Sequence, residues 1–183
     1  MKKLILPMAV CAAAFAFSYG INSGLDKGES VTPFHPTHIV GPFAGKTECF
    51  PCNYQNRPQV QAWINGDSAK NVAMIGKTLE AAMAANTASE FKAMIVLVTA
   101  DAKGGASMAK ELAKENNLSK IAISVLNPKD AAVKSYKFNT ASDVKNTVFV
   151  YKNWKVVDKF VNLNADDKGT KALKSAISGI TAH

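Results

Sequence analysis

The chain has 183 residues, of which 48% are hydrophobic and 20% are charged, and its formal net charge is +8. This composition is that of an ordinary globular protein and excludes a disordered or collagen-like chain. The length predicts a single domain with a sizeable core. Lysine supplies 21 of the 22 basic residues, and Arg57 is the only arginine. Such thinly spread lysine argues against nucleic-acid binding, which favours clustered arginine.

The first residues have the pattern of an export signal. A positive start at residues 1–3 is followed by the uncharged, strongly apolar run 4–17. This run is shorter than the about 20 apolar residues of a membrane span, so we expect no span in the mature chain. Small residues suit cleavage after Ala16 or Gly20. We therefore expect residues 1–20 to be a cleaved signal peptide and the protein to be periplasmic or secreted.

Removal of residues 1–20 leaves one pair of cysteines as the candidate reactive group. The cysteine count falls from three to two because Cys11 is lost, and the net charge falls from +8 to +6 because two lysines are lost. The remaining pair lies in Cys49-Phe50-Pro51-Cys52. In an oxidising compartment, an isolated pair at this spacing predicts a disulfide.

The chain divides into an arm and a regular part. Residues 21–58 are rich in glycine and proline, and we expect an irregular arm that carries the cysteine pair, with one short strand at 38–40. In residues 59–183, apolar runs predict strands, and apolar spacings of three and four predict helices. The expected strands span 59–64, 92–99, 121–126, 147–151 and 155–161, and the expected helices span 68–86, 104–116, 128–136 and 166–180.

This order of elements predicts an α/β fold. Strands alternate with helices, so we expect a three-layer sandwich whose sheet is mixed and mostly parallel. A tight turn at Lys152-Asn153-Trp154 predicts a β-hairpin that closes the sheet.

The order of elements, with a Cys-x-x-Cys ahead of it, resembles the thioredoxin-like superfamily over about residues 59–180. The extra helix and strand are most similar to the layout of thiol-disulfide reductases and peroxiredoxins. The stretch 41–52 is similar to a group of secreted bacterial thioredoxin-like proteins. The resemblance implies a thiol-disulfide redox role for Cys49 and Cys52, with a redox protein or an envelope protein as partner and no cofactor.

The sequence departs from that family at two places. In thioredoxins the cysteine pair follows the first core strand and begins the next helix, whose N-terminus lowers the thiol pKa. The matching residues 65–69 contain no cysteine, and the pair is expected near the other end of that strand. The family's cis-proline precedes a threonine of a later strand, whereas this chain has Asn146 before Thr147.

Three interpretations of the pair follow. In the redox interpretation Cys49 attacks and Cys52 resolves, because thiolates are the nucleophiles. In the second, a non-catalytic binding or assembly module carries a structural disulfide, although a four-residue loop contributes only about 1.9 kcal/mol by chain entropy. In the third, His35 and His38 join the cysteines in a Cys₂His₂ metal site, but the spacing does not match common zinc sites, and we expect no metal.

Overall fold

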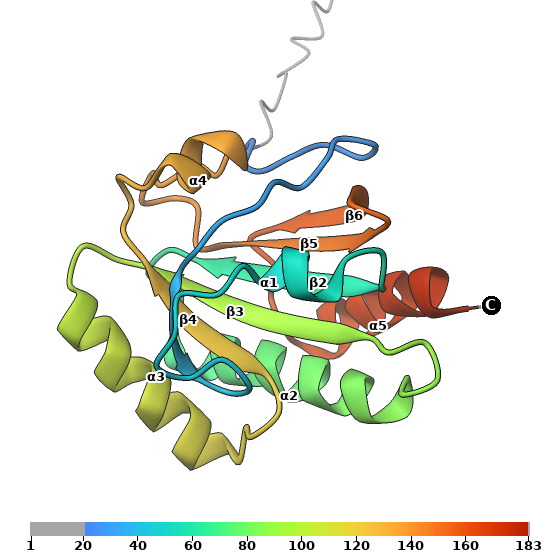
Figure 1. Cartoon of the computed structure of the whole chain (residues 1–183), viewed down its shortest axis with the longest axis horizontal. Helices are drawn as coiled ribbons and strands as arrows, with labels where there is room; N and C mark the ends of the chain where they lie inside the picture. Colours follow the sequence, from blue (N-terminus) through green and yellow to red (C-terminus); the bar gives the residue numbers. More distant parts are fainter. Residues whose placement is uncertain (1–20, 183) are drawn as a thin grey trace, which may run out of the picture.

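The computed structural model describes residues 21–182, so the expected signal peptide lies outside the described residues. These residues form a mixed six-stranded sheet in the order β1-β4-β3-β2-β5-β6, with helices on its faces (Figure 1). The strands are β1 (Thr37–Val40), β2 (Gln59–Ile64), β3 (Lys92–Val98), β4 (Ala122–Leu126), β5 (Asn146–Lys152) and β6 (Lys155–Val161). The helices are α1 (Phe50–Tyr54), α2 (Ala69–Ala85), α3 (Ala102–Asn116), α4 (Ala131–Ser135) and α5 (Asp167–Thr181).

The expected α/β fold and closing hairpin are confirmed, but parallel pairing is more limited than expected. Only β2–β3 and β3–β4 are parallel, whereas β1–β4, β2–β5 and β5–β6 are antiparallel. A parallel connection must return the chain to the end at which the previous strand began. The segment 127–145 instead leaves β4 and enters β5 at the same end of the sheet, so β5 runs in the opposite direction.

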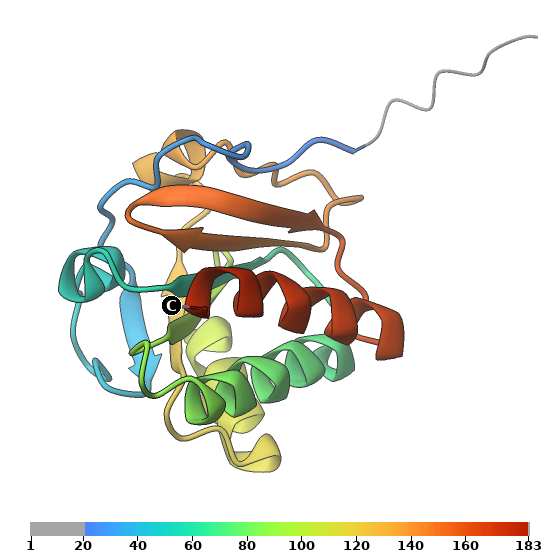
Figure 2. The same cartoon turned by 90° about the vertical axis from the view of Figure 1, so that its right-hand side faces the viewer.

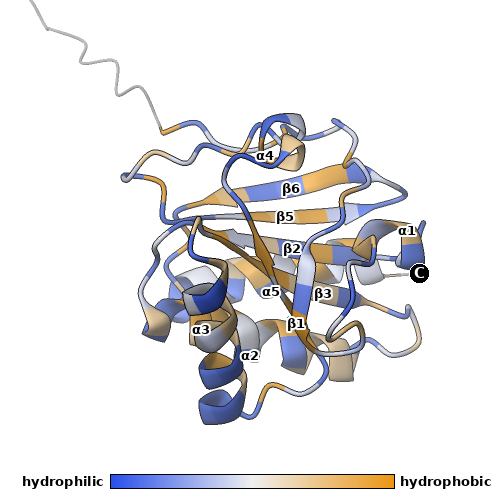
Figure 3. Ribbon diagram, turned by 60° about the vertical axis from the view of Figure 1, so that its left-hand side comes forward, coloured by the Kyte–Doolittle hydropathy of each residue, from blue (hydrophilic) through white to orange (hydrophobic). Residues whose placement is uncertain are grey.

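The sheet is the middle of three layers. Helices α2, α3 and α5 cover one face and bury the side chains of Val60, Ala62 and Ile64 from β2. The N-terminal arm, α1 and α4 cover the other face, where Trp63 of β2 is buried (Figures 1 and 2). Hydrophobic residues are concentrated in the strands, and α3 presents many hydrophilic residues (Figure 3). Among residues 21–182, no helix is both long and apolar enough to cross a membrane.

Capping side chains fix where the helices begin. Ser68 caps α2 by accepting a hydrogen bond from the amide of Asn71, as expected for a serine at this position. Helix α3 begins two residues before the expected Gly104, because Asp101 caps it. Helix α4 begins after the cap residue Asp130, later than expected, because the proline that was expected to start it lies in the preceding turn.

The arm is less irregular than expected. The short strand β1 is confirmed and pairs with β4, but the sequence did not predict α1. A helix of five residues offers too few positions for a 3.6-residue apolar pattern, and its start depends on a cysteine cap that is not a common cap residue.

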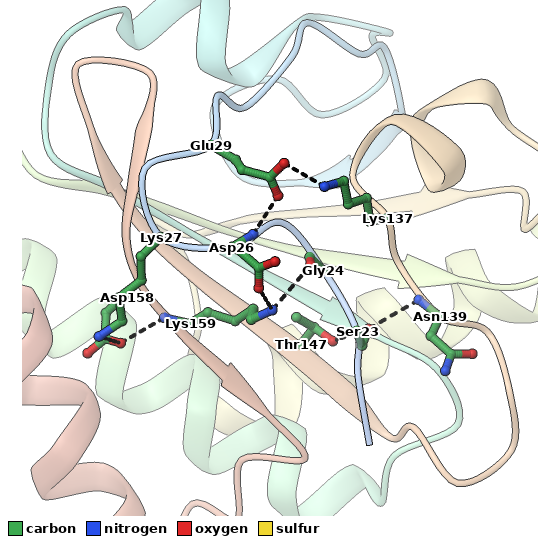
Figure 4. Close-up of polar contacts among 10 residues, drawn as sticks. All are labelled: Ser23, Gly24, Asp26, Lys27, Glu29, Lys137, Asn139, Thr147, Asp158 and Lys159. Atoms are coloured by element: carbon green, nitrogen blue, oxygen red, sulfur yellow. Dashed lines mark hydrogen bonds and ion pairs between the residues drawn. The ribbon is translucent and has the colours of Figure 1, made fainter. Parts of the chain in front are cut away.

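The first residues of the arm are fastened to the β5–β6 hairpin and to the segment before β5 (Figure 4). The hydroxyl of Thr147 donates a hydrogen bond to the hydroxyl of Ser23 at 2.7 Å, and both groups are buried. The amide of Gly24 donates to the carbonyl of Lys137 at 2.8 Å. The ammonium of Lys159 lies 2.7 Å from the carboxylate of Asp26. Hydrogen bonds and an ion pair therefore hold the arm against the sheet.

Candidate functional site

The predicted cysteine pair forms a disulfide on α1. Cys49 is the N-cap of this helix, and its sulfur accepts a hydrogen bond from the amide of Cys52 at 3.3 Å. The two Cα atoms are 5.2 Å apart, within the usual range for a disulfide. The short helix thus places both sulfurs at its first turn.

The two cysteines differ in exposure. Cys49 is only 5% exposed and belongs to the core, whereas Cys52 is partly exposed. Thiol–disulfide exchange depends on which sulfur the incoming thiolate can reach. The geometry therefore offers Cys52 to an external thiol more readily than Cys49.

Two buried polar side chains fasten α1 to the sheet, one from the edge strand β1 and one from the interior strand β2. At its N-terminal end, Nε2 of His38 lies 2.9 Å from the carbonyl oxygen of Glu48, so Nε2 carries the proton and donates it. At its C-terminal end, the side-chain amide of Gln59 donates to the carbonyl of Gln55 at 2.9 Å. His38 is 1% exposed and Gln59 is 0% exposed. Both contacts arise from strands, so α1 is fixed relative to the sheet.

His38 is neutral in this environment. Burial is the main effect, and it lowers the pKa of His38 because a buried imidazolium lacks solvation; the Glu48 carbonyl opposes this shift. Within residues 21–182, Nδ1 of His38 is buried without a hydrogen-bond partner. The histidine therefore acts as a hydrogen-bond donor rather than as a charged group. Its acceptor, the carbonyl of Glu48, lies just before α1, which we call the Cys helix because it carries the disulfide.

Aromatic rings pack the helix against the turn that follows β1. The ring of Phe43 lies 6.3 Å from that of Phe50 and 5.8 Å from that of Tyr54, measured between centroids. Nζ of Lys92 lies 5.5 Å from the centre of the Tyr54 ring. Burial raises the pKa of Tyr54, so its hydroxyl stays protonated at neutral pH.

The structure does not assemble the four residues of the metal interpretation. His35 is exposed and His38 is buried, and both cysteines are committed to the disulfide. In the part of the chain that the structure describes, no three His, Cys, Asp or Glu side chains are grouped so that they could hold a metal ion.

No protein-family model and no curated protein matches the chain. Solved structures do match: a candidate thiol:disulfide interchange protein DsbE from Chlorobium tepidum has a TM-score of 0.63 at 17% identity, with 86% of this chain and 99% of that chain covered. The fold is thioredoxin-like. The thioredoxin domain of a thiol-disulfide oxidoreductase from Bacteroides vulgatus has a TM-score of 0.60 at 12% identity, with 84% and 99% covered. A cysteine-to-serine mutant of PrxQ from Xylella fastidiosa has a TM-score of 0.60 at 10% identity, with 86% and 99% covered.

The end of β2 that leads into α2 carries a polar network and no cysteine. This is the place, at the start of α2, where the family resemblance puts the cysteines. Here the side-chain amide of Asn146 donates to the carboxylate of Asp67 at 2.6 Å and to the carbonyl of Leu163 at 3.0 Å. The amide of Leu163 donates back to Asn146 at 2.8 Å, and Asn71 joins the same carboxylate. Among the described residues there is no cis peptide bond. Asn146 and its polar network lie at the position where the family has its cis-proline.

Helix α1, with the Cys pair, precedes β2 in the chain, and buried polar side chains lie along β2 in the thioredoxin-like core. The hydroxyl of Tyr151 donates to Gln59 at 2.8 Å and accepts from Gln61 at 2.7 Å, while Trp63 donates to Gln61 at 3.0 Å. The sequence showed polar Gln59 and Gln61 in alternation with apolar residues, a pattern that usually marks a solvated strand face. Here the arm and α4 bury that face.

Proposed function

We propose that the protein is an exported thiol-disulfide redox protein that uses Cys49 and Cys52 as a reversible pair. One observation carries the proposal: the disulfide includes a partly exposed residue, Cys52, on a helix that is fastened at both ends. Its four-residue loop contributes only about 1.9 kcal/mol to stability, so stapling the chain is a weak reason for its presence. The thioredoxin-like fold supports the same function.

The difference in exposure between Cys49 and Cys52 indicates the order of the reaction. A thiolate of the partner attacks the sulfur of Cys52, a mixed disulfide forms, and Cys49 leaves as a thiolate. The amide of Cys52 already faces the Cys49 sulfur at 3.3 Å and can stabilise that thiolate. Attack by Cys49 on the mixed disulfide then reverses the step. The order of the two cysteines in the sequence favours Cys49 as the attacking residue, whereas the difference in burial favours contact of the partner with Cys52.

A redox titration tests the proposal. The protein is equilibrated in glutathione and dithiothreitol buffers, trapped with an alkylating agent and weighed intact. We expect a midpoint between about −270 and −120 mV, the range of thiol-exchange proteins, whereas a structural disulfide lies below about −300 mV. In an insulin-reduction assay, equal rates for the wild type and Cys49→Ser would exclude activity through the pair.

A non-catalytic thioredoxin-like binding or assembly module is the second candidate function. It is favoured by the Asp67–Asn146 network, which stands where the family resemblance predicts redox chemistry. Under this alternative the disulfide is a local clamp on α1. The titration separates the two, because a clamp would remain oxidised throughout the buffered range and its sulfurs would resist alkylation.

The proposed location is the periplasm or the exterior, with a redox protein or an envelope protein as partner. The export pattern of residues 1–20 and the oxidised cysteine pair support it. Cell fractionation combined with N-terminal sequencing tests it, and an intact N-terminus on protein from the cytoplasm would contradict it.

A further inference from the structure

A groove between α2 and α3 offers a binding surface on the face of the sheet opposite the Cys helix. The two helices lie side by side on that face (Figure 1). Two cavities of about 330 and 260 Å³ open along them, and both are lined by Asp67 and Met108, so they form one continuous depression. We call this depression the α2–α3 groove. Because α1 packs on the other face, binding in this groove is separate from the redox chemistry of the Cys pair.

The α2–α3 groove has an apolar lining. Val72 of α2, Leu112 of α3 and Leu97 of β3 contribute to it. Met108, which belongs to both cavities, is 50% exposed and is the most exposed large hydrophobic side chain within residues 21–182. The flexible side chain of methionine adapts to the shape of a ligand, and its burial on binding is favourable. The groove therefore has apolar surface available to a ligand.

The charged residues of the α2–α3 groove are mainly acidic, although the chain as a whole is basic, with a formal net charge of +8. Among residues 21–182, its acidic lining residues are Asp67, Asp101, Glu111 and Glu115, and its basic lining residue is Lys70. None of these carboxylates forms an ion pair within the part of the chain that the structure describes. A ligand that carries positive charge would complement this lining.

Helix α3 separates its charges by face. Glu111 and Glu115 follow Met108 by three and seven residues, which places all three on the side of the helix that lines the groove. Lys110 and Lys114 lie further round the helix and do not line the groove. The two glutamates are four residues apart, so their like charges repel, and Glu115 also lies at the negative end of the helix dipole. A cationic ligand relieves both unfavourable effects.

We propose that the α2–α3 groove binds a cationic amphipathic helix of a partner protein. The apolar side chains of that helix pack on Met108 and the apolar lining, and its lysines or arginines, four residues apart, face Glu111 and Glu115. The stretch of α3 from Met108 to Glu115 is about 10 Å long at 1.5 Å per residue, so two turns of the partner helix cover it. The strands that line the groove, β2 and β3, are interior strands, so an extended partner segment finds no free sheet edge there.

Binding of synthetic helical peptides tests this inference. Two peptides share one apolar face and carry lysine or glutamine on the other face, and a third has the composition of the lysine peptide in an order that forms no apolar face. Fluorescence anisotropy of the labelled peptides measures each Kd. We expect the lysine peptide to bind about tenfold more tightly than either of the others at low salt. Its advantage over the glutamine peptide should shrink as salt screens the charges.

Charge variants assign the binding to the groove. Glu111→Gln/Glu115→Gln should weaken binding of the lysine peptide about fivefold, the effect of losing two exposed ion pairs. This variant should unfold at the wild-type temperature or above it, because the substitution removes the repulsion between the two carboxylates. The matched variant Glu90→Gln/Asp167→Asn removes the same charge from exposed positions outside the groove and should bind as the wild type does.

Methionine variants test the apolar contact. Met108→Gln should weaken binding of the lysine peptide about fivefold, whereas Met74→Gln changes an exposed methionine of α2 outside the groove and should have no effect. Absence of binding, equal affinities for the three peptides, or wild-type affinity in either groove variant overturns the inference. Sedimentation tests a second copy as the occupant. Self-association of the wild type that is lost in both groove variants would assign the groove to a second copy of this chain and would also overturn the inference.

Discussion

Nε2 of His38 lies 2.9 Å from the carbonyl oxygen of Glu48, the residue immediately before the disulfide. The imidazole belongs to β1, and this strand is fixed by its pairing with β4. One hydrogen bond therefore connects the start of the Cys helix to the edge of the sheet. Protonation of Nδ1 would leave this hydrogen bond in place but would put a charge on a ring that is almost fully buried, so the region around His38 is sensitive to acid.

Acidification is expected to destabilise the protein through His38. Burial lowers the pKa of His38 below its usual value of 6.5, so the unfolded chain binds this proton more readily than the folded chain. The contribution of His38 is constant above about pH 6.5. Below it, the free energy of unfolding falls with pH by up to about 1.4 kcal/mol per unit, until the pH reaches the folded-state pKa.

Urea unfolding between pH 5 and pH 8 measures this effect. His38→Gln should flatten the slope, because its amide can donate to Glu48 but does not titrate. The matched variant His35→Gln should retain the slope, since His35 is exposed. Identical slopes for His38→Gln and the wild type would contradict the prediction.

Loss of Gln59 should loosen the other end of the Cys helix. Gln59→Leu fills the same space but removes the donor to Gln55 and the acceptor for Tyr151. A buried group left without its partner costs about 1–3 kcal/mol, and we expect that loss in the free energy of unfolding. Reduction of the Cys49–Cys52 disulfide by dithiothreitol should also accelerate. A variant that loses stability but is reduced at the wild-type rate would show that Gln59 supports the core without fixing the helix.

Local patterns predicted most of the fold. The apolar stripe of α2 and the apolar run of β3 follow from residue spacing alone, and both are found where expected. The tight turn is confirmed by positive φ angles at Asn153 and Trp154, which suit a two-residue hairpin. These features depend on contacts between neighbours in the sequence.

The site was less predictable because its contacts are distant in the sequence. The cysteine spacing indicated the disulfide and its place before β2, but no pattern joins Gln59 to Tyr151, which is 92 residues away. The His-x-x-His spacing indicates His38 as a possible metal ligand, whereas its ring donates a hydrogen bond to a backbone carbonyl ten residues away. Long-range hydrogen bonds of this kind become visible only when the strand order is known.

Two glycines of the arm provide a matched test of its docking on the hairpin. Gly24 and Gly28 have φ angles of +84° and +85°, so alanine is similarly strained at both. A Cβ at Gly24 would lie 2.5 Å from the Phe149 ring, whereas a Cβ at Gly28 meets nothing within 4 Å. Gly24→Ala should therefore destabilise the protein by about 1–3 kcal/mol more than Gly28→Ala, the usual cost of overpacking. Thermal or urea unfolding measures the difference, and equal losses would mean that the arm is not closely packed.

Asn146 is expected to hold together the end of the sheet opposite the Cys pair. Asn146→Ala leaves the amide of Leu163 without its partner, whereas the carbonyl of Leu163 keeps the hydrogen bond from Asn71, and we expect a loss of about 1–3 kcal/mol. Asn146→Asp places a second carboxylate beside Asp67, where the amide now lies at 2.6 Å. Like charges at this distance favour protonation of one carboxyl, so the stability of Asn146→Asp relative to the wild type should improve from pH 7 to pH 4.

Neither substitution touches α1, so the midpoint potential of Cys49–Cys52 should remain at its wild-type value in both variants. Urea unfolding at the two pH values, paired with the redox titration, measures both quantities. If Asn146→Ala shifts the potential while the protein remains folded, the two ends of the sheet are coupled, and the separation of the polar network from the redox pair is wrong.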